Sequence, residues 1–475
     1  MRYRPLLFAL SLVAYSLAAD SMAAAAHAAG PAVSGPQANG QRSVAVRIDL
    51  EASGVIGAAE EDKQPNAMAG AKQPAGRPFQ LAAQFAYTET PLAPAAGAED
   101  GAASLRVLRD YRTAEATITV GKTKLKPRLA ESNQLLAVES TDRGLRFASL
   151  AGPLTREELD LVMALANPIA ADRLIPTGPL REGMTWELGA RALGPLVALE
   201  SVTLGEASGV VDAVSGRYAR LRFAGAVHGL LDGAETEYDL EGVALLDRRT
   251  NRLTRLNLGV AERRAEGPAT PAMRTKAKAR ITFASAGDNR PGQSGDAIAE
   301  ANRRLDSDEE RRLALLEPGA GVLLLHDAAW RPAGVTREAV TLKRVAGEEL
   351  VGQTTLRRLP PKRIERQPTV EEFANEMRRT LADHSPRIGK TEQWTSPGGE
   401  RCLRIVSHGV LDGSPVEWRH GLVIAAEGGP SVSFATTIYG TAEALGEADR
   451  ELQDALRFTD AGPTEQAKLP GDTVR

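Results

Sequence analysis

The feature that most constrains the fold of this chain is a strict alternation of apolar and polar residues. In 42–50, every second residue from Val44 to Leu50 is apolar, and Arg47 and Asp49 stand between them. A period of two places the apolar side chains on one face of a β-strand. The same pattern predicts further strands at 80–87, 104–109, 114–120, 133–139, 143–149, 183–188, 197–204, 207–214, 217–226, 235–246, 252–262 and 273–284.

Short turn sequences of Gly, Asp-Gly and Arg-Thr-Asn separate the later strands. Successive short strands with such turns are typical of an antiparallel meander. We therefore predict an antiparallel β-rich domain over 42–285, either an open curved sheet or a half-barrel, built as one domain or two. Within it, Thr155 and Glu158 form a capping box that predicts a helix, which Pro168 ends.

A change of composition after residue 285 predicts a domain boundary. The segment 287–295 is rich in Gly, Pro and polar residues, and 296–316 is a charged amphipathic stretch with Asp296 as its expected N-cap. We interpret 286–319 as a linker and a connector helix. Beyond it, alternation predicts strands, and a capping box from Thr369 to Glu372 predicts a helix over 370–383. A second helix is expected over 441–457, and the strands are expected at 321–326, 338–345, 348–357, 387–395, 401–408, 416–426 and 430–438.

The predicted fold class is thus α+β, with a β-rich domain followed by a sandwich of helices and antiparallel sheet over 320–460. The order of motifs in this last part resembles the PsbP-like family, which shares its fold with Mog-type Ran-binding proteins. The motifs that carry the resemblance are Trp330, Thr369–Phe373, His408–Gly413, Pro415–Trp418, Gly428–Phe434, Glu447–Leu452 and Leu456–Phe458. The resemblance implies an antiparallel sheet between helices and an assembly or protein-binding role without catalytic residues. The first 285 residues lie outside it.

The first 28 residues have the pattern of a secretory signal peptide. Arg2 and Arg4 precede an apolar run, Pro5–Ala19, and Ala26-His27-Ala28 offers small residues at a cleavage site. Together with the abundance of Arg over Lys, this predicts a bacterial protein that is secreted or periplasmic. We expect a flexible leader at 29–41 and a disordered tail at 461–475. No later apolar run approaches the roughly 20 residues of a membrane-spanning helix.

Net charge, cysteine content and the absence of known motifs exclude several partners and site types. The formal net charge is −3, and removal of the signal peptide changes it by one. Nucleic acid and anionic membrane surfaces both require a basic field, so neither is expected as a partner. Cys402 is the only Cys, which excludes a disulfide within the chain. No HExxH, CxxC, GxSxG or P-loop motif occurs, so we predict no metal, no cofactor and no catalytic residue.

One short motif occurs twice, as 228–233 and 408–413. Each begins with a His followed by Gly and ends in Asp-Gly, and an aromatic residue follows after a few positions. Asp-Gly suits a tight hairpin turn, which is the simpler interpretation. The alternative is a ligand or metal position, although stable zinc sites have three or four protein ligands. The candidate ligand-binding residues on this reading are His228, Asp232, His408, Asp412 and Trp418.

These observations favour a non-enzymatic binding protein of the cell envelope. Its partner would be another protein or an apolar ligand held by the curved sheet, because open sheets with one covered face often serve as such surfaces. The alternative function is a hydrolase whose site is assembled from scattered polar residues. The oligomeric state is not constrained by the sequence.

Overall fold

A computed structural model describes residues 43–57, 76–94, 104–141, 144–286, 294–307, 313–317, 322–336, 339–359, 368–384, 386–411, 413–425, 429–439 and 441–458. The expected signal peptide, flexible leader and C-terminal tail therefore lie outside the described residues. The chain divides into two compact units, with the main break between Arg312 and Leu313. No helix in the described ranges is both long enough and apolar enough to cross a membrane.

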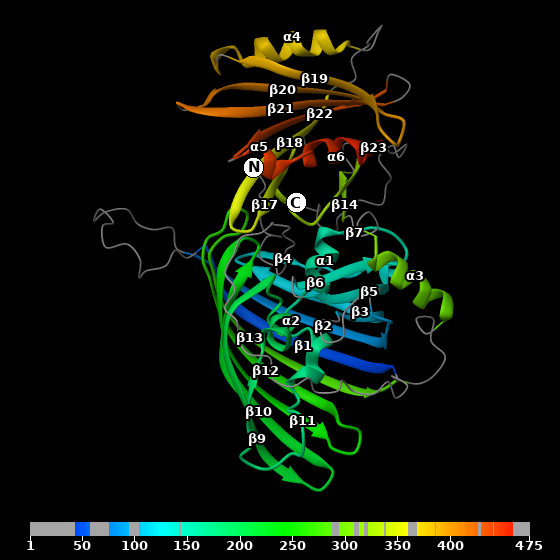
Figure 1. Cartoon of the computed structure of the whole chain (residues 1–475), viewed down its shortest axis with the longest axis vertical. Helices are drawn as coiled ribbons and strands as arrows, with labels where there is room; N and C mark the ends of the chain where they lie inside the picture. The colour runs from blue at the N-terminus through cyan, green and yellow to red at the C-terminus, as the bar shows by residue number, and fades with distance from the viewer. Residues whose placement is uncertain are drawn as a thin grey trace, which may run out of the picture. The chain divides into compact units, whose positions relative to one another are not determined.

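The first unit is built on one large antiparallel sheet (Figure 1). Its strands are β1 (Val44–Ile56), β2 (Arg77–Pro91), β3 (Leu105–Val120), β4 (Thr123–Leu125), β5 (Leu135–Thr141), β6 (Gly144–Ser149), β8 (Thr185–Leu188), β9 (Ser201–Ser215), β10 (Tyr218–Leu231), β11 (Ala234–Asp247), β12 (Arg252–Arg264) and β13 (Met273–Ser285). They follow the order β6-β5-β3-β2-β1-β13-β12-β11-β10-β9-β8, and β4 pairs with β3. Between the described end strands β6 and β8 there is no pairing, so the sheet is open.

Helices and short elements of this unit pack within the curve of the sheet or at its edge. They are η2 (Glu131–Asn133), β7 (Leu154–Thr155), α1 (Arg156–Val162), η3 (Pro168–Leu174), α2 (Ala190–Val197) and α3 (Gly295–Leu305). Figure 1 shows α1 and α2 on the inner side of the curved sheet. The strands alternate between buried and exposed residues as the sequence predicts. In β2 the side chains of Phe79, Leu81 and Phe85 are buried, while Gln80 and Gln84 are exposed.

Two segments of this unit differ from their predictions. The predicted strands 104–109 and 114–120 are one continuous strand, β3, which contains a register shift opposite Ala86 and Tyr87 of β2. The predicted strand 197–204 is wrong over its first residues, because Ala190–Val197 forms α2 and β9 begins at Ser201. A short apolar run reads equally as a buried strand or a buried helix, and here the helix buries Leu193 and Leu196.

The predicted connector helix is shorter than expected. Helix α3 ends at Leu305, and its N-cap is Ser294, whose hydroxyl accepts from the amide of Ala297, rather than Asp296. The helix packs on the first unit: Ala301 and Leu305 are buried there, and the guanidinium of Arg106 in β3 contacts Asp306 at 2.9 Å. The residues 313–316, predicted as its last turns, belong instead to a strand, since this apolar run pairs with another strand of the second unit.

The second unit contains a seven-stranded antiparallel sheet in the order β16-β17-β18-β22-β21-β20-β19. Its strands and helices are β14 (Leu313–Glu317), β15 (Val322–His326), β16 (Trp330–Val335), β17 (Ala339–Ala346), β18 (Glu349–Leu359), α4 (Val370–Thr380), η6 (Ala382–His384), β19 (Arg387–Thr395), β20 (Arg401–Leu411), β21 (Ser414–Ile424), β22 (Ser431–Ile438), α5 (Ala442–Leu445), α6 (Ala448–Asp454) and β23 (Leu456–Phe458). The predicted helix 441–457 is divided, because Gly446 adopts a positive φ of 58° between α5 and α6.

Each face of this sheet has its own apolar core. On one face, α4 packs Phe373 against Leu403 and Ile405 of β20. On the other face, Leu445 of α5 and Leu452 of α6 join a larger cluster that includes Trp330 and Phe434. The chain as a whole is therefore strand-dominated α+β with open antiparallel sheets. Cys402 lies in the larger cluster, and burial raises the pKa of its thiol to about 12, which keeps it protonated.

A buried ion network joins α6 to the sheet in the second unit. Arg404 of β20 donates to both carboxylate oxygens of Asp449, at 2.8 and 2.9 Å, and Arg419 of β21 donates to the same carboxylate at 2.8 Å. Burial alone would lower the pKa of Arg404, but Asp449 and Glu447 raise it above its ordinary value. Arg404 also contacts Glu392 at 2.9 Å, and Arg419 contacts Glu417 at 2.8 Å, but Asp449 is the fully buried carboxylate that both guanidinium groups share.

Removing that carboxylate should destabilise the second unit strongly. We expect Asp449→Asn to lower the free energy of unfolding by about 3–5 kcal/mol, because two buried cations lose their shared anion. The matched control is Glu447→Gln: Glu447 contacts the same Arg404 at 2.7 Å, but its side chain is 59% exposed, so the loss should stay below about 1 kcal/mol. Urea unfolding followed by Trp fluorescence reports mainly on this unit, which contains Trp330, Trp394 and Trp418, and equal losses for the two variants would contradict the network.

A second prediction for this unit concerns pH. Burial lowers the pKa of His420 in β21 from 6.5 to about 4. The unfolded chain therefore binds a proton that the folded chain rejects between these values, and stability falls as the pH drops from 6.5 toward 4. His420→Gln should remove about 3 kcal/mol of this pH-dependent loss. The measurement is the difference between wild-type and variant unfolding free energies across this range, and parallel curves would refute the assignment.

Candidate apolar binding site

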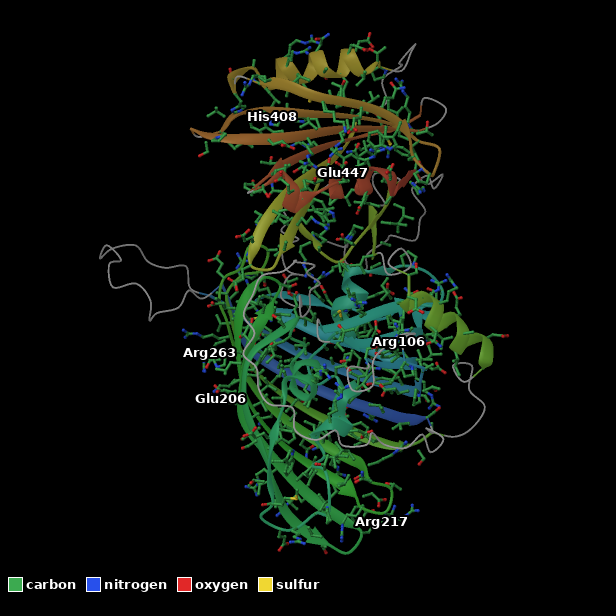
Figure 2. All side chains as sticks on the ribbon, in the orientation of Figure 1. Arg106, Glu206, Arg217, Arg263, His408 and Glu447 are labelled. Carbon is green, nitrogen blue, oxygen red and sulfur yellow. The ribbon has the colours of Figure 1, made fainter. Side chains whose placement is uncertain are left out.

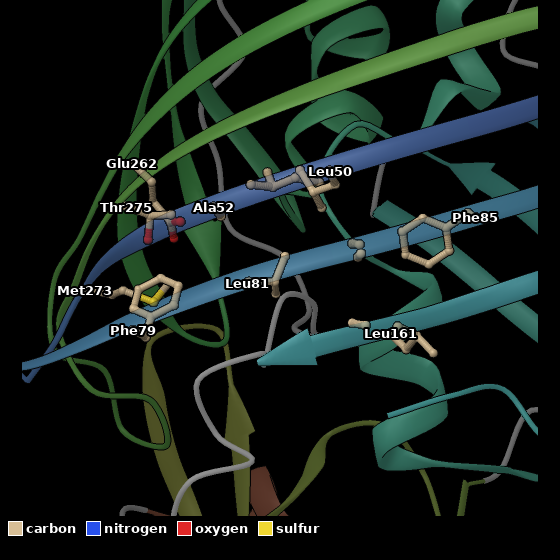
Figure 3. A pocket seen from close by; sticks show the side chains of 13 residues that line it. Leu50, Ala52, Phe79, Leu81, Phe85, Leu161, Glu262, Met273 and Thr275 are labelled. Atoms are coloured by element: carbon tan, nitrogen blue, oxygen red, sulfur yellow. The ribbon is translucent and has the colours of Figure 1, made fainter. Parts of the chain in front are cut away.

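The inner face of the large sheet is lined by apolar side chains that converge on a cavity (Figure 3). Leu50 of β1 lies directly across from Ala83 of β2, and Ala83 from Ala116 of β3, so the wall is built from cross-strand neighbours. The cavity has a volume of about 20 Å³, room for one water molecule. Its lining residues are Leu50, Ala52, Phe79, Leu81, Ala83, Phe85, Ala116, Leu161, Ala164, Leu165, Glu262, Met273 and Thr275.

Helix α1 and the residues that follow it close the cavity on the side opposite the sheet. Leu161 of α1 and then Ala164 and Leu165 contribute apolar groups to the lining. Nearly every side chain of this short helix is buried, including those of the polar residues Arg156 and Asp160. We call the segment 156–165 the cover. Its sequence forms a helix because the Thr155 hydroxyl accepts from the Glu158 amide and Glu158 accepts from the Thr155 amide.

Buried polar contacts hold the cover at both ends. At its start, the Glu158 carboxylate accepts from the side-chain amide of Asn133 at 3.0 and 3.1 Å and from the backbone of Ala130 at 2.9 Å. Just beyond its end, Arg109 of β3 donates to the side chain of Asn167 at 2.8 Å, and Asn167 also caps η3. Between these two attachments, Leu161, Ala164 and Leu165 face the cavity, and Arg156 pairs with Asp160 at 2.7 Å and lies 3.6 Å from Asp232.

Polar groups form one end of the cavity. Glu262 of β12 and Thr275 of β13 lie directly opposite each other in adjacent strands, and both side chains line the cavity (Figure 3). They are 2% and 6% exposed. Arg264 donates through Nε to Oε1 of Glu262 at 2.9 Å. Burial, reinforced by the Glu262 carboxylate, raises the pKa of Tyr238 well above its ordinary value, so this neighbouring phenol stays neutral.

His228 and Asp232 lie on opposite sides of the sheet. His228 is in β10 on the outer face, across from Glu237 of β11, which accepts two hydrogen bonds from Arg263 at 2.8 and 3.0 Å. Figure 2 shows Arg263 on the outer side of the first unit. Asp232 forms the hairpin turn with Gly233, as the motif predicts, at positive φ values of 54° and 71°. Its side chain is buried, with Arg156 of the cover 3.6 Å away.

The candidate ligand-binding residues His408 and Trp418 of the second unit also have separate structural roles. His408 of β20 is half exposed and lies across from Glu417 of β21, with 3.9 Å between Nδ1 and Oε2. Trp418 is buried, its ring 5.6 Å from that of His384, and it packs over Gly409. Asp412 lies outside the described residues. Among the residues that the structure describes, no group of three or more His, Cys, Asp or Glu is placed to hold a metal ion.

Glu262 and Thr275 were not among the residues that sequence reasoning selected, although a signal was present. In β12, Leu256, Leu258 and Val260 occupy the inward positions, and Glu262 continues the same parity. A charged residue at an inward position of an otherwise apolar face marks a buried polar site. The cover could not be placed from sequence, because its contacts with the sheet are all long-range.

Comparison with known proteins gives structural likenesses only. No family model and no curated protein matches the chain. The Ran-binding protein Mog1p of Saccharomyces cerevisiae is similar over 31% of this chain and 96% of its own, with 12% identity and a TM-score of 0.25. The match to lipovitellin covers 53% of this chain and 26% of lipovitellin, with 5% identity and a TM-score of 0.27. The match to the immunity protein TplEi of Pseudomonas aeruginosa covers 53% of this chain and 98% of TplEi, with 10% identity and a TM-score of 0.20.

The likeness to Mog1p is one of fold alone. At these TM-scores none of the three structures supports an argument about activity or ligand.

The capping boxes of α1 and α4 should respond differently to the loss of their Glu residue. Glu158→Ala removes a buried carboxylate that also holds Asn133, so local opening of α1 should become easier by about 2–3 kcal/mol. The matched control is Glu372→Ala, which removes the same capping-box residue from α4, where it is exposed, and should cost about 1 kcal/mol. Amide hydrogen exchange of 156–165 and 370–380 measures both, and equal effects would contradict the anchoring role of Glu158.

Proposed function

We propose that this chain is a non-enzymatic binding protein that holds an apolar ligand between the inner face of its large sheet and the cover. The cavity supports this proposal. Ten of its lining side chains are Leu, Ala or Phe, contributed by β1, β2, β3 and the cover. Mostly apolar walls with a few placed polar groups are the usual composition of a small-molecule site.

The cavity in this form has room for only one water molecule, so a larger ligand must displace the cover. The exchange is energetically feasible, because burial of each methylene group contributes about 0.8 kcal/mol. A chain of about ten methylene groups would therefore offset the exposure of Leu161 and Leu165, which costs roughly 2–3 kcal/mol for each side chain. The apolar middle of the cover allows this exchange, since the ligand replaces one apolar contact with another.

The compartment is part of the same proposal. The signal-like start of the chain favours export, so the ligand would be an apolar molecule of the bacterial cell envelope or its surroundings. A soluble carrier is useful there because an apolar molecule cannot cross an aqueous space unaided.

A protein partner is the second candidate, and the outer face of the first unit favours it. Strand β13 exposes Arg274, Lys276, Lys278 and Arg280, and β11 exposes Glu235, Asp239 and Glu241 two strands away. Charge ladders of opposite sign give a surface orientation and specificity toward a complementary partner. No observation among the described residues favours the hydrolase alternative.

Filling the cavity should abolish binding of an apolar probe. We expect the wild-type chain to bind N-phenyl-1-naphthylamine with a rise in fluorescence, and Ala83→Phe to weaken that binding at least about tenfold, because the new ring occupies the cavity. The matched control is Ala82→Phe, the same change one residue earlier in β2 on the exposed face, which should leave binding unchanged.

Circular dichroism checks that both variants fold. If Ala83→Phe does not fold, Ala116→Leu in β3 fills the same cavity with a smaller side chain. Native mass spectrometry of protein purified from its own host should show a retained apolar mass. Failure of the wild-type chain to bind the probe, together with a bare mass, would refute the proposed function.

A further inference from the structure

Two polar side chains at one end of the cavity indicate which head group a ligand could place there. The side chains of Glu262 and Thr275 line the cavity, and among the described residues Oε2 of Glu262 and Oγ1 of Thr275 are buried without a hydrogen-bond partner. The other Glu262 oxygen is already engaged by Arg264. A buried polar atom without a partner is costly, so each of these atoms is a ready position for a group that supplies a hydrogen bond.

The two atoms differ in what they can offer. Oε2 of an ionised carboxylate only accepts, while the Thr275 hydroxyl can donate and accept. A ligand group that satisfies both must therefore donate to Glu262 and either donate to or accept from Thr275. A hydroxyl does this with one O–H bond and one lone pair, and a primary amide does it with its NH₂ group and its oxygen.

Charge at this end of the cavity excludes an anionic group. A ligand carboxylate would face Oε2 of Glu262 in a region screened from water, where like charges repel strongly. Arg264 offsets this repulsion only in part, because it contacts Oε1 and not Oε2, the oxygen without a partner. The same guanidinium lowers the demand for a cationic ligand group.

We infer that the cavity selects ligands with an apolar chain and a neutral head that donates a hydrogen bond, such as a fatty alcohol or amide, and rejects fatty-acid anions. The head would lie between Glu262 and Thr275, and the chain would lie along the wall formed by Leu81 and Phe85, beneath the cover. This inference rests on the proposed function, since it assigns the head group of the ligand that the cavity holds.

The test is competition against bound N-phenyl-1-naphthylamine on the full chain at pH 8. We expect dodecan-1-ol to displace the probe at a concentration at least about tenfold lower than dodecanoate, and lower than dodecylammonium. Thr275→Val, which removes the hydroxyl but keeps the shape, should weaken dodecanol about fivefold and leave dodecanoate unchanged. Thr275→Ser keeps the hydroxyl and should retain the preference.

Thr282→Val is the matched control, because Thr282 lies on the same strand with the opposite parity. Tighter binding of dodecanoate or dodecylammonium than of dodecanol would overturn the inference, as would equal binding of all three that Thr275→Val does not alter. In these outcomes the probe is still displaced, so the proposed function stands. If neither the probe nor any of the three compounds binds, the proposed function fails first.

Discussion

The structure of the first unit depends on covering one apolar face. Alternation along its long strands places Val46, Ile48 and Leu50 of β1 on the same side as Phe79 and Phe85 of β2. A sheet this wide twists and curves, so its apolar face becomes the inside of an open trough. Strands alone cannot bury that face, because the described edge strands β6 and β8 do not meet. Helices α1 and α2 and the 3₁₀ segment η3 supply the missing layer.

The manner in which the cover is attached decides how it can move. Its ends are held by directional contacts of charged groups, Glu158 with Asn133 and Arg109 with Asn167. Its cavity-facing side chains, Leu161, Ala164 and Leu165, make apolar contacts, which have no preferred direction and can be exchanged for another apolar surface. The proposed entry of a ligand would therefore exchange the apolar contacts of the cover while the polar contacts at its ends stay in place.

Much of this architecture could be predicted from local pattern, and the exceptions have physical causes. Strand positions such as 44–50 and 273–284, and both capping boxes, follow from spacing alone. Helix α2 was missed because an apolar run without polar punctuation suits either element until tertiary contacts choose between them. Strand β14 was read as helix for the same reason.

The candidate site was only partly accessible to the same reasoning. Parity predicts that Leu81 and Phe85 face inward, but it does not show which segment covers them. The repeated His-to-Asp-Gly motif drew attention to His228 and Asp232, yet the hairpin turn places them on opposite faces. Residues four apart share a face only while the strand remains regular, and Asp232 belongs to the turn, where that rule ends.

A buried carboxylate in an apolar face needs a reason, and stability does not provide it. Replacement of a buried ion pair by apolar residues is often neutral or stabilising, so the pair of Glu262 and Arg264 is not explained by its strength. If compensation of charge were its only role, both carboxylate oxygens could face Arg264. Instead Arg264 engages Oε1, and Oε2 is buried without a hydrogen-bond partner in a side chain that lines the cavity across from Thr275. This geometry suits the proposed ligand site, because Arg264 contacts Oε1 and leaves Oε2 available as an acceptor.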